Sequence, residues 1–200
     1  MAALLVWLLS GAHHLAHAKG NNMPTEATHA NQAEPDLGER LKSPDEAVAR
    51  KATAEAKKNI ANVDGATICL MAYRLFLLGE RDEAVFWFYA GQLRLRYYLG
   101  IYKGDPTAAG VLDAVVETFG PPINQYAFGD IPKLAKTIGD VLAWDEKTPN
   151  HIHPPLAQAL PEAEWPRVRE RIRSGMLDLK QMMLEQADEI RAQRKAQGID

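Results

Sequence analysis

The chain has 200 residues, 46% hydrophobic and 24% charged, which fits one globular domain with a single buried core. Its formal net charge is -3, and lysines and arginines are mixed with aspartates and glutamates along the chain. Nucleic-acid binding depends on a basic field, so nucleic acid is not an expected partner. The single cysteine, Cys69, excludes an internal disulfide, and its apolar neighbours predict a buried thiol.

The first 18 residues have the pattern of a secretory signal peptide. An apolar run, Ala2 to Leu9, precedes small residues that end in Ala16-His17-Ala18, and the run is too short to cross a bilayer core about 30 Å thick. The basic start of such signals is missing, since no lysine or arginine precedes Lys19. We predict a periplasmic or secreted protein of a bacterium-like cell, with no stable membrane anchor after cleavage. The alternative is a cytoplasmic protein in which residues 1–18 form a buried helix.

Residues 19–42 are polar, contain two prolines and show no hydrophobic period, so they are predicted to be a flexible linker. A single helical domain is expected over 43–200. It should begin with Ser43 as helix N-cap, Pro44 at the first helical position and Glu46 three residues after the cap. This first helix is expected to reach about Asn62.

The rest of the chain shows helical periodicity and no sustained period-two alternation. Further helices are predicted from Asp64 to Gly79, from about 82 to 100, from Asp105 to a stop at 120–122, over a short turn at 123–128, from Asp130 past Trp144, and as one long helix over 161–197. The fold class is therefore all-α, an irregular bundle of six or seven helices. The segment 148–155, rich in proline, is expected to be a rigid loop.

One part of the bundle resembles a known repeat. The segment AYRLFLLGERDEAVFWFYAGQL places small and aromatic residues at the spacing of one tetratricopeptide-like helical hairpin, within residues 66–98; these residues are Ala72, Gly79, Ala84, Phe88 and Gly91. No second copy follows, although such arrays need about three repeats to bury their faces. The resemblance implies an antiparallel helix pair and binding of a peptide or protein.

The stretch VFWFYAGQLRLRYY, residues 85–98, combines many aromatic residues with two arginines. At 100° per residue, Arg96 shares a face with Tyr89 and Gln92, whereas Arg94 lies on nearly the opposite face with Trp87. The first half of this helix is apolar all round, which predicts a position at the centre of the domain, and at most one of the two sides that carry the arginines is expected to face the core. One interpretation makes Arg94 or Arg96 an anchor for an anion or a partner. The other pairs each arginine internally with an acid such as Asp130 or Asp145 and stacks it on aromatic neighbours.

A second candidate is the segment 120–130, GPPINQYAFGD, in which Asn124, Tyr126 and Asp130 lie in a connection bounded by proline and glycine. Polar residues on rigid loops commonly form binding sites. The alternative is structural, because Asp130 suits the N-cap of the next helix and Asn124 can satisfy backbone groups.

No pattern for metal binding or catalysis accompanies these residues. His151 and His153 form an H-x-H pair without a third ligand pattern, and no serine or cysteine lies in a nucleophile motif. We therefore predict no metal, no cofactor and no catalytic residue.

The leading prediction is an exported helical protein-binding module, such as an adaptor or an inhibitor or immunity-type protein. The expected binding residues are Tyr89, Gln92, Arg94, Arg96, Asn124, Tyr126 and Asp130. The alternative is an enzyme or small-ligand binder whose pocket between helices uses the arginines, Tyr126 and Asp130.

Overall fold

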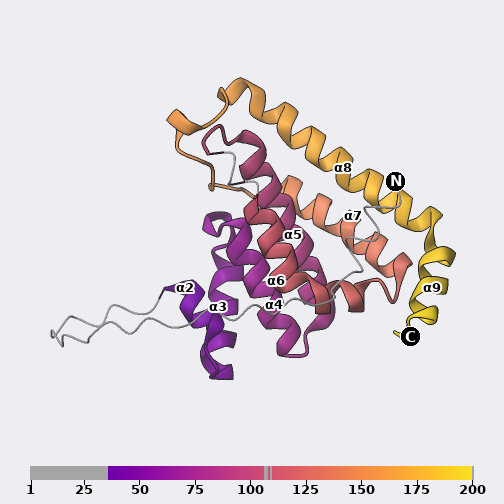
Figure 1. Cartoon of the computed structure of the whole chain (residues 1–200). Helices are drawn as coiled ribbons and strands as arrows, with labels where there is room; N and C mark the ends of the chain where they lie inside the picture. The colour runs from indigo at the N-terminus through magenta and orange to yellow at the C-terminus, as the bar shows by residue number, and fades with distance from the viewer. Residues whose placement is uncertain (1–35, 106–107, 109, 200) are drawn as a thin grey trace.

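The computed structural model describes residues 36–105, 108 and 110–199. These residues form eight α-helices packed as an all-α bundle (Figure 1). Within the described residues no strand is present, and the sole β-type pairing is an isolated bridge between Tyr102 and Ala159. The all-α prediction is confirmed, with eight helices where six or seven were expected. The predicted signal peptide, residues 1–18, lies outside the described residues.

The predicted linker 19–42 differs from the structure at its end. Residues Leu37–Lys42 form helix α2, whose N-cap Asp36 accepts a hydrogen bond from the Glu39 amide at 2.9 Å. Leu41 is fully buried in the core, and α2 packs on the next two helices. Six residues carry too few apolar positions for a period to show in the sequence, so only tertiary packing reveals this helix.

Helix α3 (Glu46–Lys58) begins two residues later than predicted. Its N-cap is Asp45, whose carboxylate accepts from the amides of Ala47 and Val48. Ser43 instead ends α2, and its hydroxyl accepts from the Asp45 amide at 3.2 Å. A carboxylate at the N-cap also interacts favourably with the positive end of the helix dipole, which explains why Asp45 and not Ser43 caps α3.

Helices α4 (Gly65–Leu77) and α5 (Arg81–Ile101) form the antiparallel hairpin at the centre of the bundle (Figure 1). α4 begins at the predicted position, with Asp64 as its N-cap, and Gly79 has a φ of 86°, the left-handed conformation that ends a helix. The Glu80 amide then donates to the Leu75 carbonyl at 3.0 Å, which closes the turn.

The two hairpin helices approach each other closely at glycines. A Cβ on Gly65 would lie 2.6 Å from the Gly91 carbonyl oxygen, and a Cβ on Gly91 would lie 2.6 Å from Cys69 Sγ. Cys69 is fully buried, as expected, and burial raises the pKa of its thiol. The close approach explains why small residues are required along this helix pair.

Helix α6 (Gly110–Ala127) contradicts the predicted stop at 120–122, because it continues through Pro121 and Pro122. Gly120, which precedes the prolines, has no Cβ to clash with the following ring, and Pro121 is exposed. Beyond the prolines, Ile123 and Asn124 are buried in the bundle, which offsets the cost of the missing backbone donors. The segment 120–130 is thus mostly helix, and only its last three residues form a connection.

Helix α7 (Ile131–Lys147) begins at the predicted N-cap, since Asp130 accepts from the Lys133 amide at 3.0 Å. The predicted long helix over 161–197 is two helices, α8 (Trp165–Glu185) and α9 (Ala187–Ala196), separated at Gln186. This break lets Ile190 of α9 remain buried in the same core as Met183 of α8.

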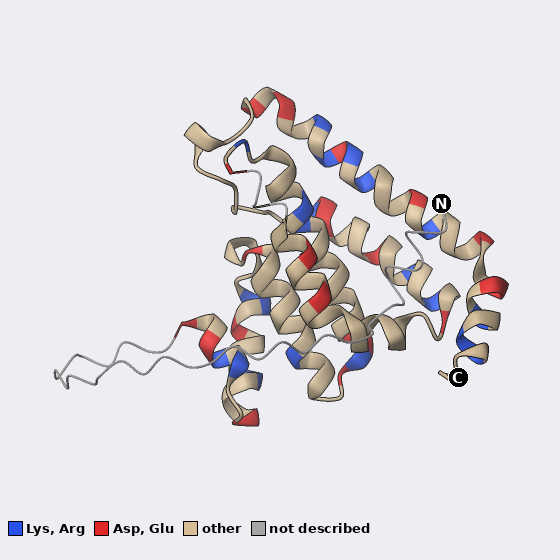
Figure 2. Ribbon diagram, viewed as in Figure 1, with Lys and Arg blue, Asp and Glu red and all other residues tan. Residues whose placement is uncertain are grey.

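Helix α8 lies along the side of the bundle, against α7 and α5 (Figure 1). Figure 2 shows acidic and basic residues intermixed along α8 and α9. No helix within the described ranges combines the length and apolar character that crossing a membrane requires.

Candidate functional site

The two arginines of α5, Arg94 and Arg96, differ in burial. Arg94 is 3% exposed, donates to the carbonyls of Ile60 and Pro149, and stacks over the Trp144 ring at 4.5 Å. Arg96 is exposed. Of the two sides that carry the arginines, the Arg94 side is buried, whereas on the other side Gln92 is buried and Arg96 is exposed. α5 is surrounded on both faces until its last turns.

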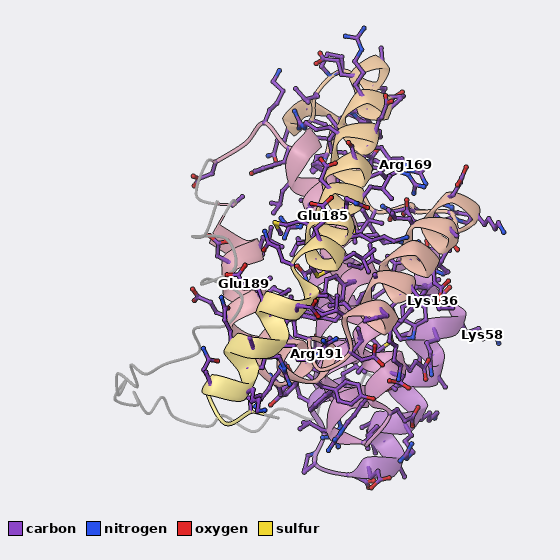
Figure 3. All side chains as sticks on the ribbon, turned by 90° about the vertical axis from the view of Figure 1, so that its right-hand side faces the viewer. Lys58, Lys136, Arg169, Glu185, Glu189 and Arg191 are labelled. Atoms are coloured by element: carbon purple, nitrogen blue, oxygen red, sulfur yellow. The ribbon has the colours of Figure 1, made fainter. Side chains whose placement is uncertain are left out.

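Arg94 and Arg96 form no ion pair with the predicted acids, Asp130 and Asp145, although Arg94 does stack on an aromatic ring, as predicted. Arg94 uses backbone carbonyls, and burial lowers its pKa, although the nearby Asp145 carboxylate acts in the opposite direction. Asp145 is already paired with Arg169 and Arg173 of α8, at 2.9 and 3.1 Å. In Figure 3, Arg169 lies on the side of α8 that faces α7. Arg94 therefore anchors the 148–153 loop to α5.

Three other predicted residues serve the interior of the hairpin. The Tyr89 hydroxyl lies 3.4 Å from Asn124 Oδ1, with both side chains buried, and burial raises the Tyr89 pKa. Gln92 accepts a hydrogen bond from Arg96 at 3.3 Å. The contact between Tyr89 and Asn124 joins α5 to α6, whereas the bond between Arg96 and Gln92 lies within α5 and satisfies the buried Gln92 oxygen.

Tyr126 and Asp130 come together at a surface cleft of about 570 Å³. We call it the hairpin-end cleft: it lies between the α4–α5 turn and the α6–α7 connection, with α9 at its edge. Its apolar walls come from Phe76, Val85 and Leu134. Two elements far apart in sequence, the hairpin and the 120–130 segment, thus form one site.

Three polar side chains of the hairpin-end cleft, Asp82, Tyr126 and Lys133, are bonded to one another. The Tyr126 hydroxyl donates to Asp82 at 2.7 Å, and Lys133 forms an ion pair with the same carboxylate. The hydrogen bonds from Lys133 and Tyr126 hold the pKa of Asp82 below its ordinary value. Arg194 of α9 is buried in the cleft wall and donates to the Gln125 carbonyl at 2.8 Å.

Arg81 is one of the cleft residues that the sequence prediction missed, together with Asp82 and Lys133. Its guanidinium lies over the rings of Phe76 and Tyr126, at 5.5 and 5.7 Å from their centres. In the sequence it follows a turn glycine and reads as an ordinary helix start. No sequence signal marks the contact, because Phe76 and Tyr126 belong to different helices.

A smaller cavity of about 300 Å³ lies beside Arg94 and includes Asp145 and Arg169 among its lining residues. The buried Asp145 carboxylate of this cavity is already paired with Arg169 and Arg173 of α8. The cavity therefore has fewer charged groups available to a ligand than the hairpin-end cleft. Across the described ranges no group of three or more histidine, cysteine, aspartate or glutamate residues could hold a metal ion. His151 lies 3.0 Å from Asn62 Oδ1, and His153 lies against the Trp165 ring.

The fold and the cleft define an all-helical bundle built around a hairpin, with a polar cleft at the hairpin end. The chain is 30% identical over 105 residues to an uncharacterized protein of Haemophilus influenzae. The match covers 52% of this chain and 41% of the relative, so the chain spans less than half of that protein's length. No family model matches the chain. No solved structure matches it either.

Proposed function

We propose that this chain is an exported protein-binding module that binds its partner through the hairpin-end cleft. The supporting observation is the meeting of the hairpin and the 120–130 segment in one cleft of about 570 Å³. Tyrosine and arginine dominate the energetics of protein interfaces, and Tyr126 and Arg81 stack on each other in this cleft. Resemblance of the hairpin to a tetratricopeptide-like unit points to the same class of ligand.

Within this class, an adaptor or an inhibitor or immunity-type protein fits a small exported binder. Export is part of the proposal and rests on the signal-like residues 1–18. Mass spectrometry of the native protein should then find its N-terminus at Lys19. An intact segment 1–18 on the native protein would contradict export.

Two matched charge reversals on α7 test the binding surface. Lys133→Glu reverses a charge in the cleft, whereas Lys136→Glu makes the same change outside it; each lysine forms one ion pair, with Asp82 and Asp140 respectively. Affinity capture from an envelope extract, quantified by mass spectrometry, should recover at least about tenfold less partner with Lys133→Glu, because like charges across an interface cost several kcal/mol. Lys136→Glu should recover as much partner as the unmodified chain. Equal recovery with both variants would contradict the proposed surface.

The alternative function, a small-ligand binder or an enzyme, has the cleft volume in its favour, because pockets for small molecules span about 300–1,000 Å³. The cleft holds Tyr126 and Asp130 of the predicted pocket, whereas Arg94 lines the smaller cavity instead. A small molecule that raises the melting temperature of the chain, but not of Lys133→Glu, would support this alternative if no protein partner is captured.

A further inference from the structure

The guanidinium of Arg81 contacts two aromatic rings and is not paired with a carboxylate of the described residues. Its guanidinium is exposed and stacks on Phe76 and Tyr126, and among the described residues it makes no hydrogen bond or ion pair. Nearby Arg50, by contrast, pairs with both Glu46 and Glu80. Stacking fixes the plane of a guanidinium but leaves its edge donors open. Arg81 therefore offers a preorganised set of donors at the cleft.

The two carboxylates of the cleft are occupied by other groups. Asp82 accepts from Tyr126 and pairs with Lys133, and Asp130 accepts from the Lys133 amide as the cap of α7. Neither carboxylate forms an ion pair with Arg81. The charge of Arg81 thus remains available to a ligand.

The surroundings of Arg81 favour a singly charged ligand group beside apolar atoms. Asp82 and Asp130 line the same cleft and would repel a dianionic phosphate more strongly than a carboxylate. A planar carboxylate matches the edge of a guanidinium and accepts two parallel hydrogen bonds. Next to it, Phe76, Val85 and Leu134 offer an apolar wall for a neighbouring side chain.

We propose that the hairpin-end cleft recognises an acidic segment of the partner polypeptide, with Arg81 binding its aspartate or glutamate carboxylate and the aromatic and aliphatic wall receiving an adjacent apolar side chain. This inference rests on the proposed function and specifies the chemistry of the partner. It assigns Arg81 the role of the charged anchor.

The test uses the full chain and two capped peptides of equal length that place either glutamate or glutamine between two leucines. Nuclear magnetic resonance titration follows the side-chain Nε–H of Arg81. The glutamate peptide should shift this resonance saturably, and the glutamine peptide should bind about tenfold or more weakly, since a charge-assisted pair is lost. Added salt should weaken the binding of the glutamate peptide, because Arg81 is exposed and salt screens its attraction to the carboxylate.

A matched pair of substitutions assigns the effect to Arg81. Arg81→Gln should weaken binding of the glutamate peptide about tenfold or more, measured on backbone amides of the cleft. Arg167→Gln should leave it unchanged, because Arg167 is an exposed arginine of α8 outside the cleft. Circular dichroism should show the same helix content in both variants.

Several outcomes would overturn the inference. These are equal binding of the two peptides, an unchanged affinity in Arg81→Gln, and no saturable shift with the glutamate peptide. Binding of free glutarate as tight as that of the peptide would show a small carboxylate site, and tighter binding of a phosphoserine peptide would show a phosphate site. The proposed function is tested separately: if Lys133→Glu loses the captured partner but Arg81→Gln retains it, the cleft binds a protein and the carboxylate inference fails.

Discussion

At the scale of single residues, Arg94 and Arg96 show how position in the bundle separates two identical side chains. They lie two residues apart in α5, yet Arg94 is 3% exposed and Arg96 reaches solvent. Arg94 donates to two backbone carbonyls, one before α4 and one in the 148–153 loop. Its role is to hold these segments together rather than to bind a ligand.

Replacing Arg94 should therefore destabilise the fold. Arg94→Met removes two charge-assisted hydrogen bonds to backbone carbonyls and the contact of the guanidinium with the Trp144 ring, so we expect a loss of about 2–4 kcal/mol in the free energy of unfolding. Arg96→Met should cost no more than about 1 kcal/mol, because Arg96 is exposed and makes one side-chain hydrogen bond, to Gln92 at 3.3 Å. Urea unfolding followed by circular dichroism measures both. Equal losses would contradict the anchoring role of Arg94.

At the scale of elements, the α4–α5 hairpin depends on the absence of side chains at the helix crossing. Gly65 and Gly91 let the backbones approach so closely that a Cβ on Gly91 would lie 2.8 Å from the Gly65 carbonyl oxygen. This hairpin supplies one side of the hairpin-end cleft, so the spacing of the two helices also sets the position of Arg81 relative to Tyr126.

Two glycine substitutions test the crossing. Gly91→Ala should cost about 1–3 kcal/mol, because the new methyl group would overlap Cys69 Sγ and a backbone oxygen that cannot move alone. Gly175→Ala, at a helical position of α8 with nothing within 4 Å of the added Cβ, should instead stabilise by about 0.5–1 kcal/mol. Thermal unfolding of both variants measures the difference, and a neutral Gly91→Ala would show that the helices can separate without cost.

At the scale of the whole molecule, ion pairs between helices make the free energy of unfolding depend on pH. A hydrogen bond from Lys133, supported by Tyr126, lowers the pKa of Asp82, and one from Arg40 lowers the pKa of Glu55. A carboxyl group with a lowered folded-state pKa stabilises the fold above its ordinary pKa, which is about 4. This contribution disappears as the pH falls through the lower folded-state pKa.

We therefore expect the free energy of unfolding to be nearly constant from about pH 7 to pH 5 and to decrease below about pH 4. Asp82→Asn should flatten part of this decrease, because amide 82 no longer titrates. The effect of Asp82 should shrink in high salt, since its side chain is 60% exposed. Urea unfolding at a series of pH values measures the slope, and an identical slope in Asp82→Asn would contradict the assignment.

Several elements could be predicted because their signals are local. Asp64, Gly79 and Asp130 mark helix ends through bonds to residues within a few positions of themselves, and the structure has a helix end beside each of them, as predicted. The all-α class likewise follows from apolar periodicity along single helices. Pro121 and Pro122 are a local signal for a helix stop, yet α6 continues through them. Burial of the next helical turn against the core outweighs the effect of the prolines.

The sequence by itself determined the helical class, several helix ends and two of the residues that line the cleft, Tyr126 and Asp130. Only the tertiary structure decided which arginine is buried, where helix α2 packs and that Arg81 faces Phe76 and Tyr126. The physical reason is range: caps and amphipathic faces are set by neighbours within one or two turns, whereas a cleft forms from side chains brought together by the packing of separate helices.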